Sequence, residues 1–447
     1  MPSPITRSLA RAMRLPQNFQ LVPTIVELHP DQPVAPFAQQ LAHQLNIDIG
    51  QIIPSMNMFA LLAPHDLVYR LAGTSIVRGL YYDRPHYAFQ GQGWPIPPPL
   101  PDPLGLFPQQ VKEAAQKVVG PMVTKDGWIP TLETHKTLHL DILHKLGYTG
   151  KGVKVAVLDT GVDPNHPQLS GRISGMYSMV PASDPLDRQG HGSHVITTIR
   201  GKEYAAPFTG LTCKGGAPDC TLLSYKVLSD AGFGSTSDIL KGMEDAVAQG
   251  ARIISMSLGG DGADDEESDP MVQFINKAHE TNPSVIFSIA VGNSGPDAKT
   301  IGIPACAEHA LTVGSWGLLD NAVAYFSSRG STLQAGRVKP DICGPGGGRA
   351  KAETRPKELI YSGTAFGSML DAIEDHMVDG FASLQGTSMA TPVVSAVLAC
   401  WLQRLPMLKV DDIKAIFKMF GKPKTNDYGH GLIDAGWLMQ ALETEMR

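Results

Sequence analysis

Three side chains whose types together could carry out nucleophilic catalysis stand in distinctive local settings. Asp159 ends the apolar run KVAVLD, His191 lies between glycines in GHGSHV, and Ser388 lies in GTSMATP. A serine becomes a nucleophile when a neutral imidazole takes its proton and a carboxylate orients that imidazole. The order Asp, His, Ser is one of the known chain orders of such a set. These residues are therefore predicted to meet in one catalytic site.

The same chemistry needs a donor for the negative charge that develops on the substrate oxygen. Asn293, in AVGNSGP after an apolar run, offers a side-chain amide in a loop flanked by Gly292 and Gly295. A donor of this kind is worth about 10²–10³ in kcat. An Asn in a glycine-containing turn is also common without any catalytic role.

Taken singly, each residue has a simpler interpretation. Asp159 could cap the following turn, and Ser388 could be a helix N-cap, with Pro392 accommodated in the first turn of that helix. His191 and His194 form an HxxH pair, but the offset differs from the HExxH zinc helix and no third ligand is evident. No metal site is predicted there, and His194 is predicted to be structural.

Buried-type strands alternate with amphipathic helices from about residue 130 onward. Near-continuous apolar runs are typical of parallel strands covered on both faces, and a capped helix with one apolar face lies between two of them. This alternation predicts an α/β architecture with right-handed crossovers. The strands are expected at 154–159, 222–228, 253–258 and 285–292, and the helix at 237–250.

Six ordered motifs resemble those of the subtilase family, the subtilisin-like serine peptidases: VAVLDTGVDPNHPQL, GHGSHV, SMSLGG, AVGNSGP, GTSMATP and YGHGLIDAGWL. The resemblance runs from about Tyr148 to the C-terminus. It implies a three-layer fold with a mainly parallel sheet and a peptidase domain over 131–447. It also implies an endopeptidase that forms an acyl-enzyme on protein or peptide substrates.

The resemblance assigns further roles to individual residues. Ser388 with Asp159 and His191 would form the triad, and Asn293 would join a backbone N–H of Ser388 in the oxyanion hole. Ser257-Leu258-Gly259-Gly260 would pair with the substrate backbone as an added strand. Gly259 and Gly302 would shape the pocket for the residue before the cut, which is expected to accept large apolar side chains.

Residues 20–88 follow a different pattern, β-α-β-β-α-β, the split ferredoxin-like order. In this position the unit resembles the propeptide of many subtilases, which templates folding and then inhibits the enzyme until removed. A self-processing zymogen is therefore expected, with cleavage between residues 85 and 133; 87–92 and the proline-rich segment 91–108 are both candidates. The alternative is an unrelated small domain. Residues 1–19 are expected to be a disordered tail and 89–130 a linker and activation region.

Composition sets wider limits. A net charge of -6 without basic runs predicts no nucleic-acid partner, and no window is apolar enough to span a membrane. The N-terminus lacks a secretory apolar region, so a cytoplasmic enzyme is expected. Five scattered cysteines predict free thiols, although an exported protein could join Cys213 to Cys220.

Some segments depart from the family pattern. Gln168 replaces the aspartate of an HPDL tetrapeptide that usually helps to hold a tight calcium ion, and the loop after HGSHV also differs. No cofactor is therefore expected to be required, and the usual tight calcium site is expected to be lost. Calcium binding at a weaker site built from carbonyls near Ala305–Ala310 is the alternative. The acidic run 261–269 is expected to be a solvated loop, with a negative rim or a cation site as alternatives. Residues 368–380 are expected to include a short amphipathic helix.

Two other functions remain open at this level. A subtilase fold could bind peptides without cutting them, although that role would not need the complete set of Asp159, His191, Asn293 and Ser388. The acyl-enzyme could also pass to an amine rather than to water, which would make the protein a peptide ligase or macrocyclase.

Overall fold

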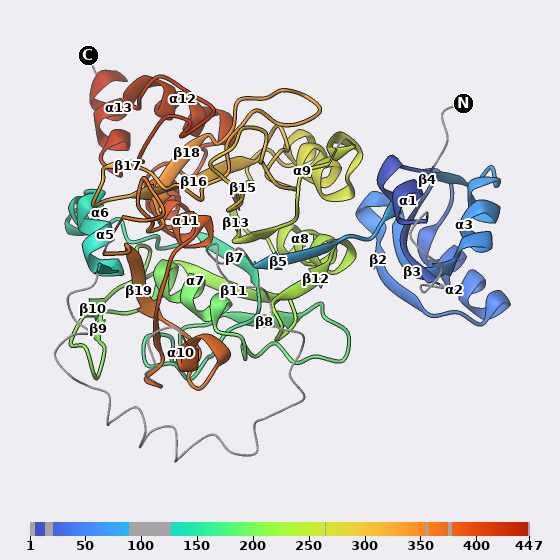
Figure 1. Cartoon of the computed structure of the whole chain (residues 1–447), viewed down its shortest axis with the longest axis horizontal. Coiled ribbons are helices and arrows are strands. Elements are labelled where there is room, and N and C mark those ends of the chain that lie inside the picture. The colour runs from blue at the N-terminus through green and yellow to red at the C-terminus, as the bar shows by residue number, and fades with distance from the viewer. Residues whose placement is uncertain are drawn as a thin grey trace.

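The computed structural model describes residues 5–13, 21–88, 127–263, 265–354, 356–373 and 378–445, which form a small N-terminal unit and a larger second unit (Figure 1). The proline-rich segment at 91–108, predicted to be an extended linker, lies outside these residues. None of the helices in the described ranges is long and apolar enough to span a membrane.

The N-terminal unit has the predicted β-α-β-β-α-β order, with strands arranged β2-β3-β1-β4 and every neighbouring pair antiparallel. Asn46, just after α2, and Asn57, just before β3, adopt left-handed conformations that asparagine tolerates. Its elements are β1 (Leu21–Leu28), α2 (Val34–Leu45), β2 (Ile49–Ile53), η1 (Pro54–Met56), β3 (Met58–Pro64), α3 (His65–Ala72) and β4 (Val77–Tyr82).

Its sheet is apolar on both faces because alternate residues of each strand point in opposite directions. Val26 and Phe59 pack beneath α2 and α3, whereas Ile25 and Met58 belong to an apolar cluster shared with the larger unit. A sheet of this kind needs a cover on each side, and the larger unit provides the second cover.

The prediction of a disordered tail at 1–19 is wrong for its middle part. Residues Arg7–Ala12 form α1, whose N-cap Thr6 accepts a hydrogen bond from the Leu9 backbone N–H. Leu9 is fully buried against the N-terminal sheet, and burial of this apolar side chain stabilises a helix too short to persist alone.

The larger unit is built on a sheet in the order β17-β16-β15-β13-β7-β11-β8, with β18 beside β16. All of its pairings are parallel except β16 with β17, so the predicted α/β class with a mainly parallel sheet is confirmed. Its strands are β7 (Lys154–Asp159), β8 (Gly175–Ser178), β11 (Thr221–Lys226), β13 (Ile253–Met256), β15 (Ile286–Ala290), β16 (Leu311–Gly317), β17 (Ala322–Val323) and β18 (Ile342–Pro345).

Helices cover both faces of this sheet and give three layers. Val155 and Val157 of β7 lie in one apolar cluster with α7 and α11, and Ala156 and Leu158 lie in another with α8 and α9. The predicted helix at 237–250 is α8, capped by Ser235 rather than Ser237. The layers are completed by α7 (His191–Arg200), α8 (Thr236–Ala248), α9 (Pro270–Thr281), α11 (Thr387–Arg404), α12 (Val410–Phe420) and α13 (Trp437–Glu445).

Shorter elements connect and border the layers. Trp128–Pro130, predicted as the end of the linker, instead forms strand β6, which pairs in parallel with β19. The remaining elements are β5 (Pro85–Ala88), α5 (Thr131–Thr137), α6 (Leu140–Lys145), β9 (Tyr204–Ala205), β10 (Thr212–Cys213), β12 (Phe233–Ser235), β14 (Leu258–Gly259), η4 (Glu266–Ser268), β19 (Leu359–Gly363), α10 (Met369–Ile373) and β20 (Phe381–Leu384).

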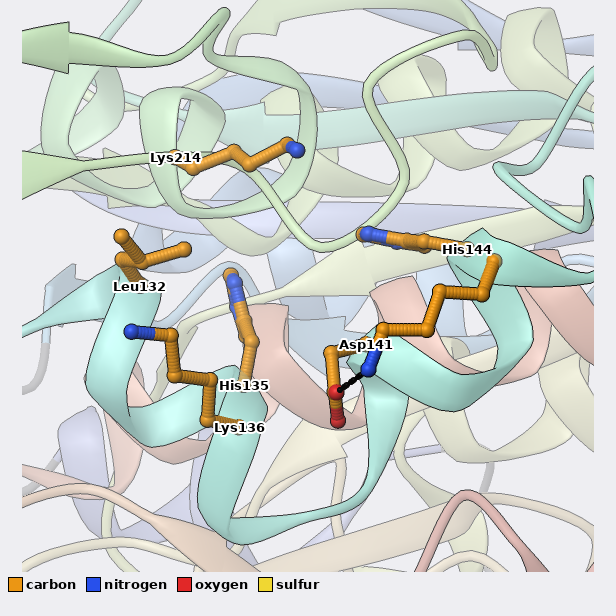
Figure 2. Close-up of a pocket in the computed structure, with 7 residues that line it drawn as sticks. Leu132, His135, Lys136, Asp141, His144 and Lys214 are labelled. Carbon is orange, nitrogen blue, oxygen red and sulfur yellow. Dashed lines mark hydrogen bonds and ion pairs between the residues drawn. The ribbon is translucent and has the colours of Figure 1, made fainter.

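A hollow of about 210 Å³ lies between α5, α6 and Lys214 (Figure 2). Buried His135 lines it, and burial lowers the pKa of that imidazole to about 3. The Lys145 ammonium at its rim is held by Asp141 at 2.8 Å. This hollow is separate from the site described next.

Candidate active site

Asp159 and His191 meet at the carboxyl edge of the parallel sheet. Asp159 is the last residue of β7, and its Oδ1 lies 2.8 Å from His191 Nδ1. Both side chains are buried, with exposed fractions of 1% and 0%. The second ring nitrogen, Nε2, is buried and has no hydrogen-bond partner among the described residues. The imidazole is thus fixed on one side and available on the other.

Glycines shape the turn that delivers His191, as predicted. Gly190 caps α7 at φ 106°, a conformation that residues with a Cβ rarely adopt, and a Cβ there would lie 2.5 Å from Ser368 Oγ. A Cβ on Gly192 would lie 2.3 Å from the Gly161 carbonyl oxygen. The start of α7 can therefore approach the end of β7 closely.

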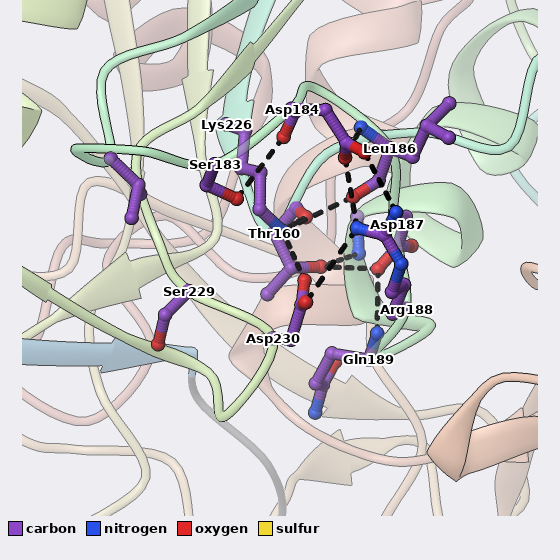
Figure 3. A network of polar contacts seen from close by, with 12 residues as sticks. Thr160, Ser183, Asp184, Leu186, Asp187, Arg188, Gln189, Lys226, Ser229 and Asp230 are labelled. Carbon is purple, nitrogen blue, oxygen red and sulfur yellow. Dashed lines mark hydrogen bonds and ion pairs between the residues drawn. The ribbon is translucent and has the colours of Figure 1, made fainter. Parts of the chain in front are cut away.

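A buried polar network fixes this approach (Figure 3). The Thr160 hydroxyl donates to Asp187 at 2.9 Å and accepts from the Gly192 N–H at 2.9 Å. Asp187 also accepts from the backbone N–H groups of Gly190 and Ser193. Burial raises the pKa of Asp187, and these hydrogen bonds oppose that rise. One threonine and one aspartate thus tie the strand end to the first turn of α7.

Lys226 closes the network from the neighbouring strand. Its ammonium is fully buried and donates to the carbonyl oxygens of Thr160 at 2.6 Å and Leu186 at 3.2 Å, and to Asp230 at 2.7 Å (Figure 3). A buried ammonium needs partners of this kind. It holds the loops that follow β7 and precede α7.

Ser388 lies in the first turn of α11, a helix that packs against α7. Its hydroxyl donates to the Ser257 carbonyl oxygen at 2.9 Å. His191 Nε2 has no hydrogen-bond partner among the described residues, so the Ser388 hydroxyl is not hydrogen-bonded to it. Catalytic hydrogen bonds are often formed only when substrate is bound. Serine and imidazole thus start neighbouring helices, while the bond between them is not made.

Pro392 lies in the interior of α11, not in its first turn as predicted. A proline has no N–H, so the carbonyl four residues earlier, that of Ser388, loses its helical partner. The Ser257 hydroxyl donates to this carbonyl at 2.9 Å and satisfies it. The exchange of hydrogen bonds between Ser257 and Ser388 is therefore reciprocal and joins the predicted nucleophile to the predicted substrate-binding segment.

Asn293 presents its amide with a defined orientation. Its Oδ1 accepts hydrogen bonds from both the backbone N–H and the hydroxyl of Thr387, each at 2.9 Å. The Nδ2 donor is buried and has no partner among the described residues. Unpaired buried donors are costly. Asn293 Nδ2 lies next to the start of α11, where it can donate a hydrogen bond to a substrate oxygen that gains negative charge.

The predicted substrate-binding segment already pairs with a strand of this chain. β5 lies between β12 and β14, antiparallel to both, with Tyr87 opposite Gly259 and Ala88 opposite Leu258. The Ala88 N–H donates to the Gly232 carbonyl oxygen at 3.2 Å. The edges of β12 and β14 therefore form a groove that takes an extended peptide by strand addition.

Gly302 lies beside the residue that follows β14. Its backbone N–H donates to the Val291 carbonyl oxygen, and the adjacent Ile303 pairs with Gly260 as an antiparallel bridge. The structure thus brings the segment from Ser257 to Gly260 next to Gly302. It brings Ser257 next to Ser388.

Comparison with known proteins agrees with this geometry. Residues 150–431 match the family model described as the subtilase family. This chain belongs to the subtilase family. Serine protease AprX of Bacillus subtilis (strain 168) is 37% identical over 310 residues, which cover 64% of this chain and 66% of AprX. The chain therefore spans slightly less than two thirds of that relative.

Other curated relatives show similar identity over the same share of this subtilase. Subtilisin Savinase of Lederbergia lenta is 35% identical over 295 residues, covering 65% of this chain and 92% of Savinase. M-protease of Shouchella clausii (strain KSM-K16) is 36% identical over 295 residues and is covered to 65% of its length.

The prediction that the acidic run 261–269 is a solvated loop is wrong for residues 265–269, whereas Asp261 is exposed. Asp265, Glu266 and Asp269 of this subtilase are buried, and Arg84 of the N-terminal segment pairs with Asp265 at 2.7 Å and lies 3.8 Å from Asp269. Asp265 also accepts from the N–H and hydroxyl of Ser8. Burial favours a higher pKa of Asp265, but the Ser8 hydrogen bonds and the Arg84 charge together lower it. Sequence reasoning missed this interface because its basic partner is 181 residues away.

Gln168, at the position where the family resemblance implies a calcium ligand, makes hydrogen bonds of its own. Its Nε2 donates to the carbonyl oxygens of Lys202 at 3.0 Å and Cys213 at 3.3 Å. An amide donor thus contacts carbonyls of the kind that calcium binds. That the tight calcium site is lost stays a prediction.

His194 and the cysteines have structural positions. His194 Nε2 lies 3.2 Å from the Ile360 carbonyl oxygen, and burial lowers the pKa of this imidazole to about 3. All five cysteines are free and buried, so Cys213 and Cys220 are not joined. The predicted short helix near residue 370 is α10 (Met369–Ile373), whose start is bonded to the Arg188–Gln189 backbone just before His191.

Sequence reasoning also missed Thr160, Asp187 and Lys226. The position of Thr160 directly after Asp159 could have indicated a role for it. No pattern in the sequence predicts that Thr160 pairs with Asp187 or that Lys226 binds the carbonyl oxygens of Thr160 and Leu186. These residues act through the backbone that carries His191, so they are positioning residues.

We expect Thr160→Val to lower the free energy of unfolding by about 1–3 kcal/mol, because it leaves the buried Gly192 N–H without its acceptor. Urea unfolding of the full chain, in a Ser388→Ala background that prevents self-digestion, measures this loss. Ser183→Ala, which removes an exposed hydroxyl bonded to the Asp184 carbonyl, is the control. Equal stability of the two variants would contradict the role assigned to Thr160.

Proposed function

We propose that this subtilase is a serine endopeptidase in which Ser388, His191 and Asp159 form the catalytic triad. The buried 2.8 Å contact between Asp159 and His191 Nδ1, with Nε2 left available, is the observation that carries the proposal. A hydrogen bond from Nδ1–H to the carboxylate leaves the lone pair on Nε2. That lone pair is the base a serine nucleophile requires.

The proposed reaction begins when the Ser388 hydroxyl turns from the Ser257 carbonyl to His191 Nε2. Ser388 Oγ then attacks the scissile carbonyl carbon while its proton passes to Nε2, and His191 returns that proton to the leaving amine. Water hydrolyses the acyl-enzyme by the same steps in reverse. Asn293 Nδ2 and the N–H groups at the start of α11 stabilise the oxyanion, aided by the helix dipole.

Substrates bind, in this proposal, as β5 does in the structure. Their backbone is added as a strand between β12 and β14, and Gly259 and Gly302 shape the pocket next to the cut. The mode requires an extended protein or peptide segment and fits an endopeptidase. The alternatives, a binding-only protein and a peptide ligase, have no observation of their own in favour.

The N-terminal unit would be both inhibitor and first substrate, so that the protein is made as a self-processing zymogen. In support, β5 fills the groove, and Ala88 lies opposite Leu258, one residue from Ser257. Continuing this register by one residue would put the cut after position 89, within the predicted range 87–92. Position 89 itself lies outside the described residues.

We expect Ser388→Ala to lower the rate of peptide hydrolysis by at least about 10⁴-fold and to keep the N-terminal unit attached. Wild type should instead yield a mature chain whose N-terminus falls between residues 88 and 93. Casein hydrolysis and N-terminal sequencing measure the two outcomes. The control is Ser395→Ala, a buried serine on the same helix that bonds to Ser255.

Two results would overturn parts of this proposal separately. Equal hydrolysis by wild type and Ser388→Ala would exclude Ser388 as the nucleophile. An identical N-terminus near Met1 in both proteins, with hydrolysis lost only in the variant, would exclude self-processing but leave the peptidase. Mass spectrometry of products from a defined peptide separates hydrolysis from ligation.

We expect Asn293→Ala to lower kcat by about 10²–10³ with little change in KM, because the donor acts on charge that develops in the transition state. Steady-state kinetics on a short peptide measure both constants. Thr387→Val is the matched control: it removes a hydroxyl that orients Asn293 but keeps Nδ2, so its effect should be smaller. An equal change in both variants would argue against a role for Nδ2.

Protonation of His86 should oppose inhibition by the N-terminal unit in acid. Its Nε2 lies 2.8 Å from Thr236 Oγ1 in the docked structure, and burial, with a smaller contribution from the Arg84 charge, lowers the pKa of His86 to about 3. An undocked unit regains the ordinary value of about 6.5. Below pH 6.5, His86 therefore takes up a proton when the unit undocks, and this protonation weakens docking. Above pH 6.5 His86 is neutral in both states, so it no longer weakens docking.

We expect the ratio of the inhibition constant of wild type to that of His86→Gln to be roughly 20-fold higher at pH 5 than at pH 7. Inhibition constants of the cleaved N-terminal unit against its mature partner measure it. Burial raises the pKa of Asp83 to about 6, which acts in the opposite direction, so only the difference between the two proteins reports on His86. Parallel profiles would exclude this role.

A further inference from the structure

A cluster of metal-ligating side chains lies on the surface of the larger unit, apart from the residues assigned above. His279 is in the last turn of α9, His309 is in the turn before β16, and Asp411 is in the first turn of α12. Their candidate ligand atoms all lie within 4.8 Å of one another. Three segments distant in sequence thus present two imidazoles and a carboxylate at one place.

The spacing within the cluster is close to that of a coordination shell. His279 Nε2 lies 3.4 Å from Asp411 Oδ2, and neighbouring ligands of a tetrahedral zinc ion with bonds of 2.0–2.2 Å are about 3.3 Å apart. The imidazole of His309 stacks on that of His279, with ring centroids 3.7 Å apart and planes 6° from parallel. A metal ion requires these rings to turn so that one nitrogen of each converges on it.

The surroundings leave the donor atoms available. His279 Nδ1 is buried and has no hydrogen-bond partner among the described residues. The Asp411 side chain is 65% exposed, so it can move toward an ion and leave a position for water. Burial, the charge on His279 and nearby Lys414 lower the pKa of His309, whereas Glu308 and Asp411 raise it.

We propose that His279, His309 and Asp411 form a binding site for a divalent transition-metal ion, of which Zn²⁺ is the probe. Imidazole and carboxylate ligands in this number suit zinc, whereas calcium prefers oxygen ligands alone. The ion would fasten α12 to α9 and to the turn before β16. This site differs in ligands and in place from the calcium position at Gln168, and it requires no peptidase activity.

The test uses the full chain carrying Ser388→Ala, titrated with Zn²⁺ in a calorimeter. The parent should bind one more equivalent of Zn²⁺ than the same chain carrying His309→Asn or Asp411→Asn. If the stoichiometry is equal, the parent should bind Zn²⁺ at least 10–100-fold more tightly than these variants. Zn²⁺ should also raise the Tm of the parent and not of these variants. Co²⁺ bound to the parent should give the visible absorption bands of a tetrahedral site, and Ca²⁺ should not compete.

The matched control is His139→Asn. His139 Nδ1 lies 2.9 Å from Asp434, but among the described residues this pair belongs to no group of three metal-ligating side chains, and its φ of 59° suits asparagine. This variant should bind Zn²⁺ like the parent. Because Asp411 is mostly exposed, Asp411→Asn carries the test if His309→Asn does not fold. Equal stoichiometry, affinity and Tm shift in parent, Asp411→Asn and His139→Asn would overturn the proposal.

Discussion

The hydrogen bond between Asp159 and His191 is the constraint on which the rest of the site depends. It joins the end of a central strand to the first residue of a helix, and both side chains are buried. A carboxylate withdrawn from water is stable only where its surroundings satisfy it. Asp159 Oδ1 also accepts from the Thr160 backbone N–H at 2.7 Å, whereas Oδ2 has no hydrogen-bond partner among the described residues. Thr160, Asp187 and Lys226 hold the backbone on either side of this pair.

A second constraint comes from the interior of α11. Pro392 removes one helical hydrogen bond, and the carbonyl that it frees is that of Ser388. The Ser257 hydroxyl takes that bond, while the Ser257 carbonyl accepts the Ser388 hydroxyl. The missing helical hydrogen bond at Pro392 thus joins Ser388, the proposed nucleophile, to Ser257 of the proposed peptide-binding segment. The same helix start orients Asn293 through Thr387.

The N-terminal unit and the larger unit meet through complementary chemistry. One face of the small sheet shares an apolar cluster with α8 and α9, Arg84 meets the acidic run at Asp265, and β5 continues into the groove. Apolar burial gives the contact its strength, and the buried ion pair and strand pairing fix its position. The proposed role of this unit as inhibitor and first substrate would need this combination, because only the segment in the groove would have to be cut.

The sequence by itself determined the α/β class, the β-α-β-β-α-β order and the family, and it predicted a site made of Asp159, His191, Asn293 and Ser388. These depend on local periodicity and on motifs, which short stretches of chain carry alone. Only the tertiary structure decided that the acidic run is an interface, that residues 7–12 are helical and that Lys226 lies beneath Thr160. It also placed Pro392 inside α11 and brought His279, His309 and Asp411 together. Each of these depends on partners far away in sequence, and burial and long-range pairing leave no local periodic pattern.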